Sequence, residues 1–309
     1  MRIGVVGAGR IGGFLAGALA RAGVEVGVVA RGEHLAAIAR DGLHVESDLG
    51  SFTVRVEAAS DLRELAAFDV LLLAFKAHHW PEFGPQLEPV SRMATTIVTM
   101  QNGLPFWYVR EPPLESVDPG GRIGALFPDE RVIGGAVHVS GHVARPGTIR
   151  QSGGMRYVLG APGGGADARS EALAQTMRSA GLDPEVDVDI RRTVWLKLVN
   201  NAGLNPVSAL RGLTIRPMLA DPAARAEVRA LMEEALHVGQ AMGVVHEVDI
   251  DARIAYAARL DDVKTSMLQD YERGRALEVE PILGALIELG RRYGVEVPRL
   301  RAAHQALHA

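Results

Sequence analysis

Residues 1–30 read MRIGVVGAGR IGGFLAGALA RAGVEVGVVA. The β-branched run Arg2–Val6 leads into a glycine turn, and the small residues of Phe14–Ala22 then predict a helix that ends at Gly23. A second apolar run, Val24–Ala30, predicts another buried strand. These residues therefore predict a β-turn-α-β unit, which is typical of a parallel sheet covered by helices.

The turn itself has a pattern that binds dinucleotides. It reads Gly7-Ala8-Gly9-Arg10-Ile11-Gly12, a G-x-G-x-x-G placed between a strand and a helix. The first glycine permits a tight turn, the second lets a pyrophosphate approach the backbone, and the third lets the helix pack closely on the strand. The helix N-terminus adds N–H groups and the positive end of a dipole. We predict that these six residues bind a dinucleotide; the alternative is a purely structural glycine turn.

The end of the second strand indicates which dinucleotide is bound. An NAD site usually has an Asp or Glu there to hold the ribose 2′-hydroxyl, but this chain reads Val28-Val29-Ala30-Arg31-Gly32. The guanidinium of Arg31 can make a bidentate contact with a 2′-phosphate. The sequence therefore predicts NADP(H) as the cofactor. A solvated arginine is the alternative, because Glu33 also lies nearby.

Length and composition limit the classes of function. A chain of 309 residues that is 48% hydrophobic can bury the cores of two domains. Its 33 basic and 37 acidic residues give a net charge of −4, which argues against a nucleic-acid partner. The glycines and Arg10 within the first apolar stretch argue against a signal peptide or membrane span, so we expect a cytoplasmic protein without a membrane partner.

The residues that commonly bind metals give no metal site. The chain has no cysteine, which excludes disulfides and thiolate ligands. The pairs His78-His79 and His138-x-x-x-His142 lack an evident acidic partner, and the second pair falls in strand and turn sequence. We therefore predict no metal.

The pattern of elements changes along the chain. Further buried strands are predicted at Val70–Phe75 and Thr96–Thr99, and period-two alternation between Val132 and Leu159 predicts added antiparallel strands. Helical spacing then dominates, in Arg191–Asn205, Ala223–Ala241, Ile250–Arg259 and Pro281–Tyr293. We predict an α/β Rossmann-type domain over residues 1–188, which binds NADP, and an all-α domain over residues 189–309, which binds substrate.

Lysine is rare in this chain and its positions are informative. Of the 33 basic residues only Lys76, Lys197 and Lys264 are lysines. A guanidinium stays charged in proteins, whereas an ammonium can donate a proton. Lys76 follows an apolar strand, at the sheet edge where ligands bind in open α/β folds, and Lys197 lies within an apolar helical segment. The alternative is compositional drift that leaves three lysines by chance.

Two amides share a helix face with Lys197. Asn201 and Asn205 follow it at steps of four residues, so the three side chains project from one face. Such a polar stripe on an otherwise apolar helix needs hydrogen-bond partners, which a polar substrate would supply. An interdomain hydrogen-bond network is the alternative. Pro206 is predicted to end or kink this helix.

Together these motifs resemble the ketopantoate reductase family. The resemblance spans nearly the whole chain in the right order and implies a helical C-terminal domain of the 6-phosphogluconate-dehydrogenase type and a homodimer. It rests on the glycine turn, Lys76, Gln101-Asn102-Gly103, residues 195–201 (WLKLVNN) with Asn205-Pro206, residues 266–270 (SMLQD) and Glu278-Val279-Glu280.

The resemblance implies NADPH-dependent reduction of the 2-keto acid 2-dehydropantoate to (R)-pantoate, a step toward pantothenate and coenzyme A. The family's general acid matches Lys197, and its catalytic carboxylate matches Glu278, which also lies close to the cofactor. Substrate contacts match Asn102, Lys197, Asn201, Asn205 and Ser266, and Asn102 and Lys76 match residues near the nicotinamide. From the residues alone, the favoured explanation of Ser266 is a helix N-cap and that of Glu278 a first-turn acid.

Other functions stay open from the sequence. Phe106-Trp107-Tyr108 lies beside the expected nicotinamide pocket, and Val263 stands where a pantoate enzyme can have a substrate-facing Asn. Both features favour a divergent reductase of a bulkier 2-keto acid. Other dehydrogenases also combine a Rossmann half with a helical half, but we do not expect residues 266–270 and Glu278 in them. A non-catalytic NADPH-sensing module is a further alternative, which the Lys197 stripe argues against.

Overall fold

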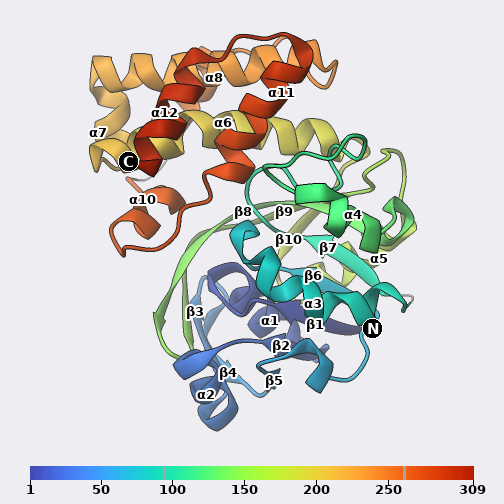
Figure 1. Ribbon diagram of the computed structural model, residues 1–309. Helices are drawn as coiled ribbons and strands as arrows, with labels where there is room; N and C mark the ends of the chain where they lie inside the picture. The colour runs from blue at the N-terminus through green and yellow to red at the C-terminus, as the bar shows by residue number, and fades with distance from the viewer. Residues whose placement is uncertain (94, 260–261) are drawn as a thin grey trace. The chain divides into compact units, whose positions relative to one another are not determined.

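A computed structural model describes residues 1–93, 95–259 and 262–309 (Figure 1). The chain divides into two compact units, one formed by residues 1–101 and 122–190 and the other by residues 102–121 and 191–309. The segment 102–121 thus leaves the first unit and folds with the second. The division predicted at residue 188 does not include this excursion, and the roles predicted for the two domains stay predictions.

The first unit is built on one sheet of ten strands. Strands β5, β2, β1, β6, β7 and β8 lie side by side in that order and are parallel throughout. β9 then pairs antiparallel with β8 and parallel with both β3 and β10, and β4 closes this end antiparallel to β3. The strands are β1 (Arg2–Val6), β2 (Glu25–Val29), β3 (Leu43–Ser47), β4 (Gly50–Val54), β5 (Glu57–Ala59), β6 (Val70–Leu73), β7 (Thr96–Thr99), β8 (Val132–Arg145), β9 (Thr148–Gly160) and β10 (Asp183–Val186).

Helix α1 (Arg10–Arg21) is the centre of this unit's core. It packs on β1 and β2 near one end of the sheet and on β3, β4, β8 and β9 toward the other, so the sheet curves around it (Figure 1). The other helices and 3₁₀ turns are α2 (Gly32–Asp41), η1 (Leu62–Glu64), η2 (Ala77–His79), α3 (Trp80–Ser91), α4 (Arg122–Leu126), η4 (Asp129–Arg131) and α5 (Ala168–Ser179).

The second unit is helical in its described residues. Helix α8 packs against α7, α9, α11 and α12, and the buried Trp195 of α6 donates its indole N–H to the Ala235 carbonyl of α8 at 3.2 Å. The elements are η3 (Pro119–Gly121), α6 (Ile190–Arg211), α7 (Ile215–Ala220), α8 (Pro222–Ala241), α9 (Ile250–Arg259), α10 (Ser266–Tyr271), the π-helical turn η5 (Glu280–Gly284), α11 (Ala285–Tyr293) and α12 (Pro298–His308). The predicted architecture, a Rossmann-type α/β part followed by an all-α part, is confirmed.

Pro206 was predicted either to end or to kink the helix that contains Lys197. It does not end the helix, because α6 continues through it to Arg211. Pro206 itself is buried, so packing of the apolar helix face compensates for the backbone hydrogen bond that a proline cannot make.

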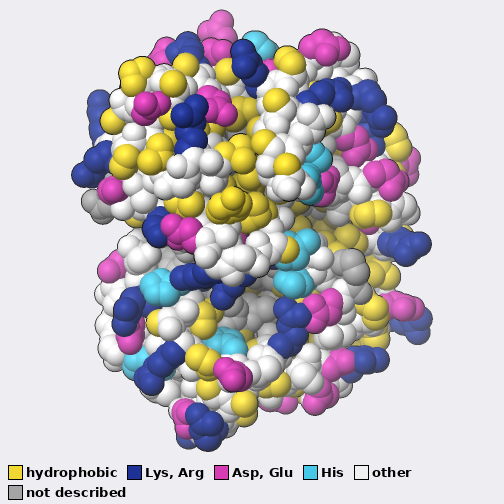
Figure 2. All heavy atoms as spheres, turned by 60° about the vertical axis from the view of Figure 1, so that its left-hand side comes forward, with side chains coloured by type: hydrophobic (Ala, Val, Ile, Leu, Met, Phe, Trp, Pro, Cys, Tyr) yellow, Lys and Arg dark blue, Asp and Glu magenta, His cyan; other side chains and the backbone are white. Residues whose placement is uncertain are grey.

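Charged side chains of both signs are mixed on the surface. Figure 2 shows Lys and Arg interspersed with Asp and Glu over the face that it presents. Among the described residues, no helix combines the length and the apolar character needed to cross a membrane.

A histidine that sequence reasoning missed fixes the glycine turn. His34 of α2 donates from Nε2 to the Ala8 carbonyl at 2.7 Å, while its Nδ1 accepts from the Gly147 N–H at 3.0 Å. Only the neutral imidazole can donate at one nitrogen and accept at the other. Burial lowers the pKa of His34 from its ordinary value near 6.5, although the Ala8 carbonyl opposes this shift. The neutral ring thus joins the turn, α2 and the β8–β9 connection.

The lowered pKa of His34 predicts a pH dependence of stability. Between the ordinary value and the lowered one, the unfolded chain binds the proton and the folded chain does not. The contribution of His34 is therefore complete above about pH 6.5 and is lost as the pH falls through the folded-state pKa. We expect urea unfolding of wild type to lose more stability between about pH 7.5 and about pH 5.5 than unfolding of His34→Gln. Equal losses in the two proteins would contradict this role of His34.

Candidate functional site

The glycine turn has the geometry that a pyrophosphate requires. Gly7 has a φ of +96°, and a Cβ on it would lie 2.8 Å from the Phe75 backbone nitrogen. A Cβ on Gly12 would lie 2.1 Å from the Gly7 carbonyl oxygen, so the helix can begin against the turn only with glycine there. Gly9, the N-cap of α1, faces open space; no side chain caps it and no acidic residue lies in the first turn. The first N–H groups of α1 therefore suit an anion.

Arg31 stands at the N-cap of α2, directly after β2, with its side chain about half exposed. Its guanidinium pairs with Glu82 of α3 and lies 5.4 Å from the centre of the Phe83 ring. His79 Nδ1 is also 3.3 Å from the Glu82 carboxylate. Burial lowers the pKa of His79, and the charges of Arg31 and Lys76 lower it further while Glu82 raises it. Arg31 and a mainly neutral His79 thus share the Glu82 carboxylate, and the charge of Lys76 also acts on His79.

In the second unit, Asn102 links an ammonium to a carboxylate. Lys197 Nζ donates to Asn102 Oδ1 at 3.1 Å, and Asn102 Nδ2 donates to Glu278 Oε2 at 3.3 Å. Lys197 is half-buried, whereas Glu278 is only 7% exposed. A carboxylate at this depth needs a donor, and the amide supplies it while accepting from the lysine. The structure therefore brings together three of the predicted site residues.

A close backbone contact places Asn102 beside Glu278. The Leu104 N–H donates to the Pro281 carbonyl at 2.8 Å, at the start of the π-helical turn η5. Gly103, between Asn102 and Leu104 in the chain, has a φ of +80°, and a Cβ on it would lie 2.4 Å from the Pro281 carbonyl oxygen. Only glycine allows residues 102–104 to lie so close to the turn that follows Glu278.

The aromatic residues after Gly103 expose almost no surface. Phe106, Trp107 and Tyr108 are at most 2% exposed, so they offer a ligand almost no contact; their expected place beside the nicotinamide pocket stays a prediction. The Tyr108 hydroxyl donates to the Arg191 carbonyl at 2.9 Å, and the Arg191 guanidinium lies 4.4 Å from the centre of the Tyr108 ring. The Tyr108 and Trp195 rings also pack, 5.8 Å between centroids. Tyr108 thus fastens this segment to the first turns of α6, the helix that includes Lys197.

In the described part of the chain, one asparagine side chain of α6 has a hydrogen-bond partner in the protein, and two do not. Arg253 of α9 donates to Asn200 Oδ1 at 3.0 Å and to the Leu196 carbonyl at 3.0 Å, so Asn200 braces the helix. Asn201 and Asn205 lie on the face of Lys197, and within the described ranges neither side-chain amide has a hydrogen-bond partner in the protein. Asn205 is only 5% exposed, and its unpartnered amide is available to hydrogen-bond a ligand.

The two structural alternatives for Ser266 and Glu278 are not supported. Thr265, not Ser266, caps α10, since its hydroxyl accepts from the Leu268 N–H at 3.2 Å. Ser266 is the next residue, half-buried, and the structure records no contact between it and Lys197. Glu278 precedes the helical turn and is bound to Asn102, so it is not a first-turn acid.

Two models of one protein family match this chain, one after the other. A family model described as ketopantoate reductase PanE/ApbA matches residues 3–164, and one for the C terminus of the same family matches residues 189–309. A 2-dehydropantoate 2-reductase of Mesorhizobium japonicum is 42% identical over 310 residues, which cover 98% of this chain and 95% of the relative.

Solved structures agree. The crystal structure of 2-dehydropantoate 2-reductase from Methylococcus capsulatus matches with a TM-score of 0.85 at 31% identity, over 100% of this chain and 96% of that one. The enzyme of the same name from Geobacter metallireducens matches with a TM-score of 0.89 at 29% identity, over 100% and 99%. With both family models matched in sequence order, the chain belongs to the ketopantoate reductase family.

Proposed function

We propose that this chain reduces 2-dehydropantoate to (R)-pantoate with NADPH, a step of pantothenate biosynthesis. The observation that carries the proposal is the hydrogen-bonded series Lys197, Asn102 and Glu278, which joins a proton donor, a positioning amide and a buried carboxylate. The relatives named 2-dehydropantoate 2-reductase support the substrate. The burial of Phe106, Trp107 and Tyr108 removes the main argument for a bulkier 2-keto acid.

The chemistry needs a hydride at the keto carbon and a proton at its oxygen. NADPH, when bound, supplies the hydride. The Lys197 ammonium hydrogen-bonds the ketone oxygen and transfers a proton to it as negative charge develops there. Asn102 holds the ammonium in position, and Glu278 accepts from Asn102 and can bind the substrate hydroxyl. The unpartnered amides of Asn201 and Asn205, with the Ser266 hydroxyl, would donate to the substrate carboxylate and hydroxyl.

Cofactor binding is assigned to the first unit. The Gly7–Gly12 turn would hold the pyrophosphate at the N-terminus of α1, with the Gly9 backbone open toward it. Arg31 would exchange its pairing with Glu82 for the 2′-phosphate, and Lys76 would add positive charge, while the neutral His79 ring could donate a hydrogen bond. This preference for NADP(H) over NAD(H) is part of the proposal. The homodimer and the cytoplasmic location stay predictions.

The direct test is the initial rate of nicotinamide oxidation, followed by absorbance, with 2-dehydropantoate and a panel of other 2-keto acids. We expect turnover of 2-dehydropantoate with NADPH. Lys197→Ala should lower kcat by about 100- to 10,000-fold, because it removes the general acid. Lys197→Arg should also fail, since a guanidinium does not give up its proton.

The matched control is Lys264→Ala. Lys264 is exposed and pairs with Glu272, so its loss should leave kcat unchanged. Binding of NADPH, followed by fluorescence, should survive in all three variants. If no 2-keto acid is turned over although NADPH binds, the chain is a sensor and not a reductase; if Lys197→Ala keeps full turnover, another group donates the proton.

Arg31→Ala tests the choice of cofactor. Loss of a charge-assisted hydrogen bond to the 2′-phosphate should raise KM for NADPH by about 10- to 100-fold and leave KM for NADH nearly unchanged. Glu82→Gln removes the competing carboxylate and should not raise KM for NADPH. An equal rise of both Michaelis constants in Arg31→Ala would show that Arg31 supports the fold and does not recognise the phosphate.

A further inference from the structure

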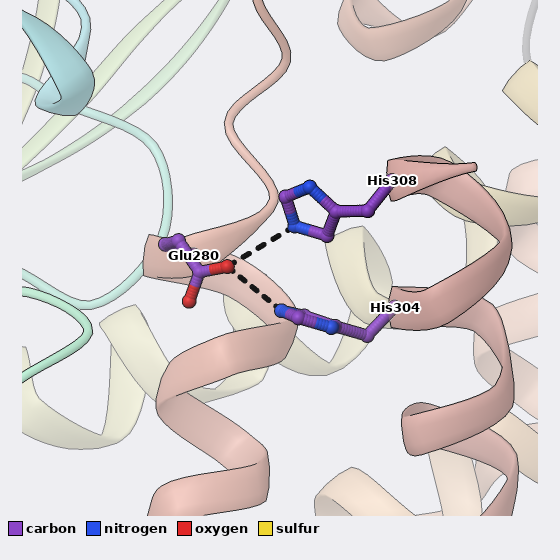
Figure 3. A group of neighbouring side chains, drawn as sticks. All are labelled: Glu280, His304 and His308. Atoms are coloured by element: carbon purple, nitrogen blue, oxygen red, sulfur yellow. Dashed lines mark hydrogen bonds and ion pairs between the residues drawn. The ribbon is translucent and has the colours of Figure 1, made fainter.

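Two histidines and one glutamate, none of them part of the Lys197, Asn102 and Glu278 series, converge in the second unit. His304 and His308 lie one turn apart on α12, and both turn Nε2 toward the Glu280 carboxylate (Figure 3). The Nε2 to Oε1 distances are 2.7 Å for His304 and 3.1 Å for His308. The three ligand atoms all lie within 4.8 Å of one another.

This donor set suits a divalent transition-metal ion. Two imidazole nitrogens and one carboxylate oxygen are ligands that Zn²⁺ binds at about 2.0–2.2 Å, and histidines spaced by four residues present both rings on one helix face. Ligand atoms around a tetrahedral ion of that size lie roughly 3.3 Å apart. The distances from Glu280 Oε1 to the two Nε2 atoms, 2.7 and 3.1 Å, are close to that value. Imidazole ligands disfavour Mg²⁺ and Ca²⁺, which prefer all-oxygen sites.

The position of the Glu280 carboxylate depends on a glycine. A Cβ on Gly284 would lie 2.2 Å from Glu280 Oε2, so the carboxylate folds back along η5 over a residue without a side chain. Gly284 has an ordinary helical φ of −55°, so its backbone conformation does not require glycine. The space above Gly284 keeps Glu280 turned toward α12, which packs against η5.

The cluster also borders a space for a further ligand. Glu280 and His304 line a cavity of about 400 Å³ together with Arg291, Arg301, Gln305 and two further carboxylates, Glu115 and Glu288. An ion with three protein ligands keeps its fourth position for water or another small ligand. This cavity gives such a ligand room beside the ion.

We propose that Glu280, His304 and His308 form a divalent metal site, with Zn²⁺ as the best-fitting ion. The site joins the last helix of the chain to the π-helical turn and is independent of the proposed reductase activity. The expectation that the chain binds no metal rested on other histidines; helix α12 is not among the predicted elements, and so the His304-x-x-x-His308 spacing went unused.

The test is calorimetric titration of the full-length protein, without a polyhistidine tag, with zinc chloride and with magnesium chloride as the negative probe. We expect one zinc per chain and no binding of magnesium. His304→Ala and His308→Ala should each weaken zinc binding by at least about tenfold, as should Gly284→Ala, which displaces the carboxylate. His237→Ala, an exposed histidine on α8, is the matched control and should bind zinc like wild type.

Two further measurements separate a lost site from a lost fold. Cobalt chloride should give the intense visible bands of a tetrahedral ion with wild type and with His237→Ala, but not with His304→Ala. Circular dichroism and the reductase assay should be unchanged in the metal-free His304→Ala and His308→Ala variants. The proposal is overturned if wild type binds no zinc, or if folded His304→Ala and His308→Ala bind it as tightly as His237→Ala; the histidines then only hydrogen-bond Glu280.

Discussion

The site depends on one side-chain amide. Asn102 accepts from the Lys197 ammonium and donates to the Glu278 carboxylate. Lys197 follows Asn102 by 95 positions in the sequence, and Glu278 follows it by 176. A carboxylate that is 7% exposed is costly without a donor, and a half-buried ammonium is held in one place only by an acceptor. An amide can meet both needs at once because it carries a carbonyl and an N–H group. Asn102 therefore fixes the relative position of the two charges.

The rest of the second unit serves to hold that amide. The chain leaves the sheet after Gln101 and returns at Arg122, so that residues 102–121 fold with the helices. Three sets of contacts hold this segment. The Leu104 N–H donates to the Pro281 carbonyl, and Tyr108 packs on α6. On α11, Glu288 accepts from Ser116 and Arg292 donates to the carbonyls of Pro112 and Pro113. Burial of three aromatic side chains supplies the free energy for an excursion that has little regular structure of its own.

The sequence predicts the local parts of this arrangement well. The G-x-G-x-x-G turn follows from a strand, a turn and a helix that are adjacent in the chain, and the Lys197, Asn201 and Asn205 stripe follows from helical periodicity. The short strands β3, β4 and β5 were not predicted, because three to five residues of mixed polarity give little periodic signal. Pro206 was read from its local cost alone, whereas tertiary packing carries α6 past it.

Contacts between distant segments could not be predicted in this way. Three consecutive aromatic residues, such as 106–108, are compatible both with a protein core and with the wall of a ligand pocket. Only the structure shows that these three are buried. Neither His34 nor Arg253 belongs to a sequence motif. Their roles are recognised only from the hydrogen bonds they make, His34 to the Ala8 carbonyl and Arg253 of α9 to Asn200 of α6. The roles of Lys197 and Glu278 came from resemblance to a family, and the structure adds the amide that connects them.

The central claim is that Asn102 and Glu278 act as one unit on Lys197. A double-mutant cycle of Asn102→Ala and Glu278→Gln, followed by kcat for reduction of 2-dehydropantoate with NADPH, tests it most directly. The account predicts that the second substitution costs far less in the variant that already has the first, with a coupling energy of roughly 1 kcal/mol or more. Effects that add to within about 0.5 kcal/mol would show that the two residues act separately and would contradict the account.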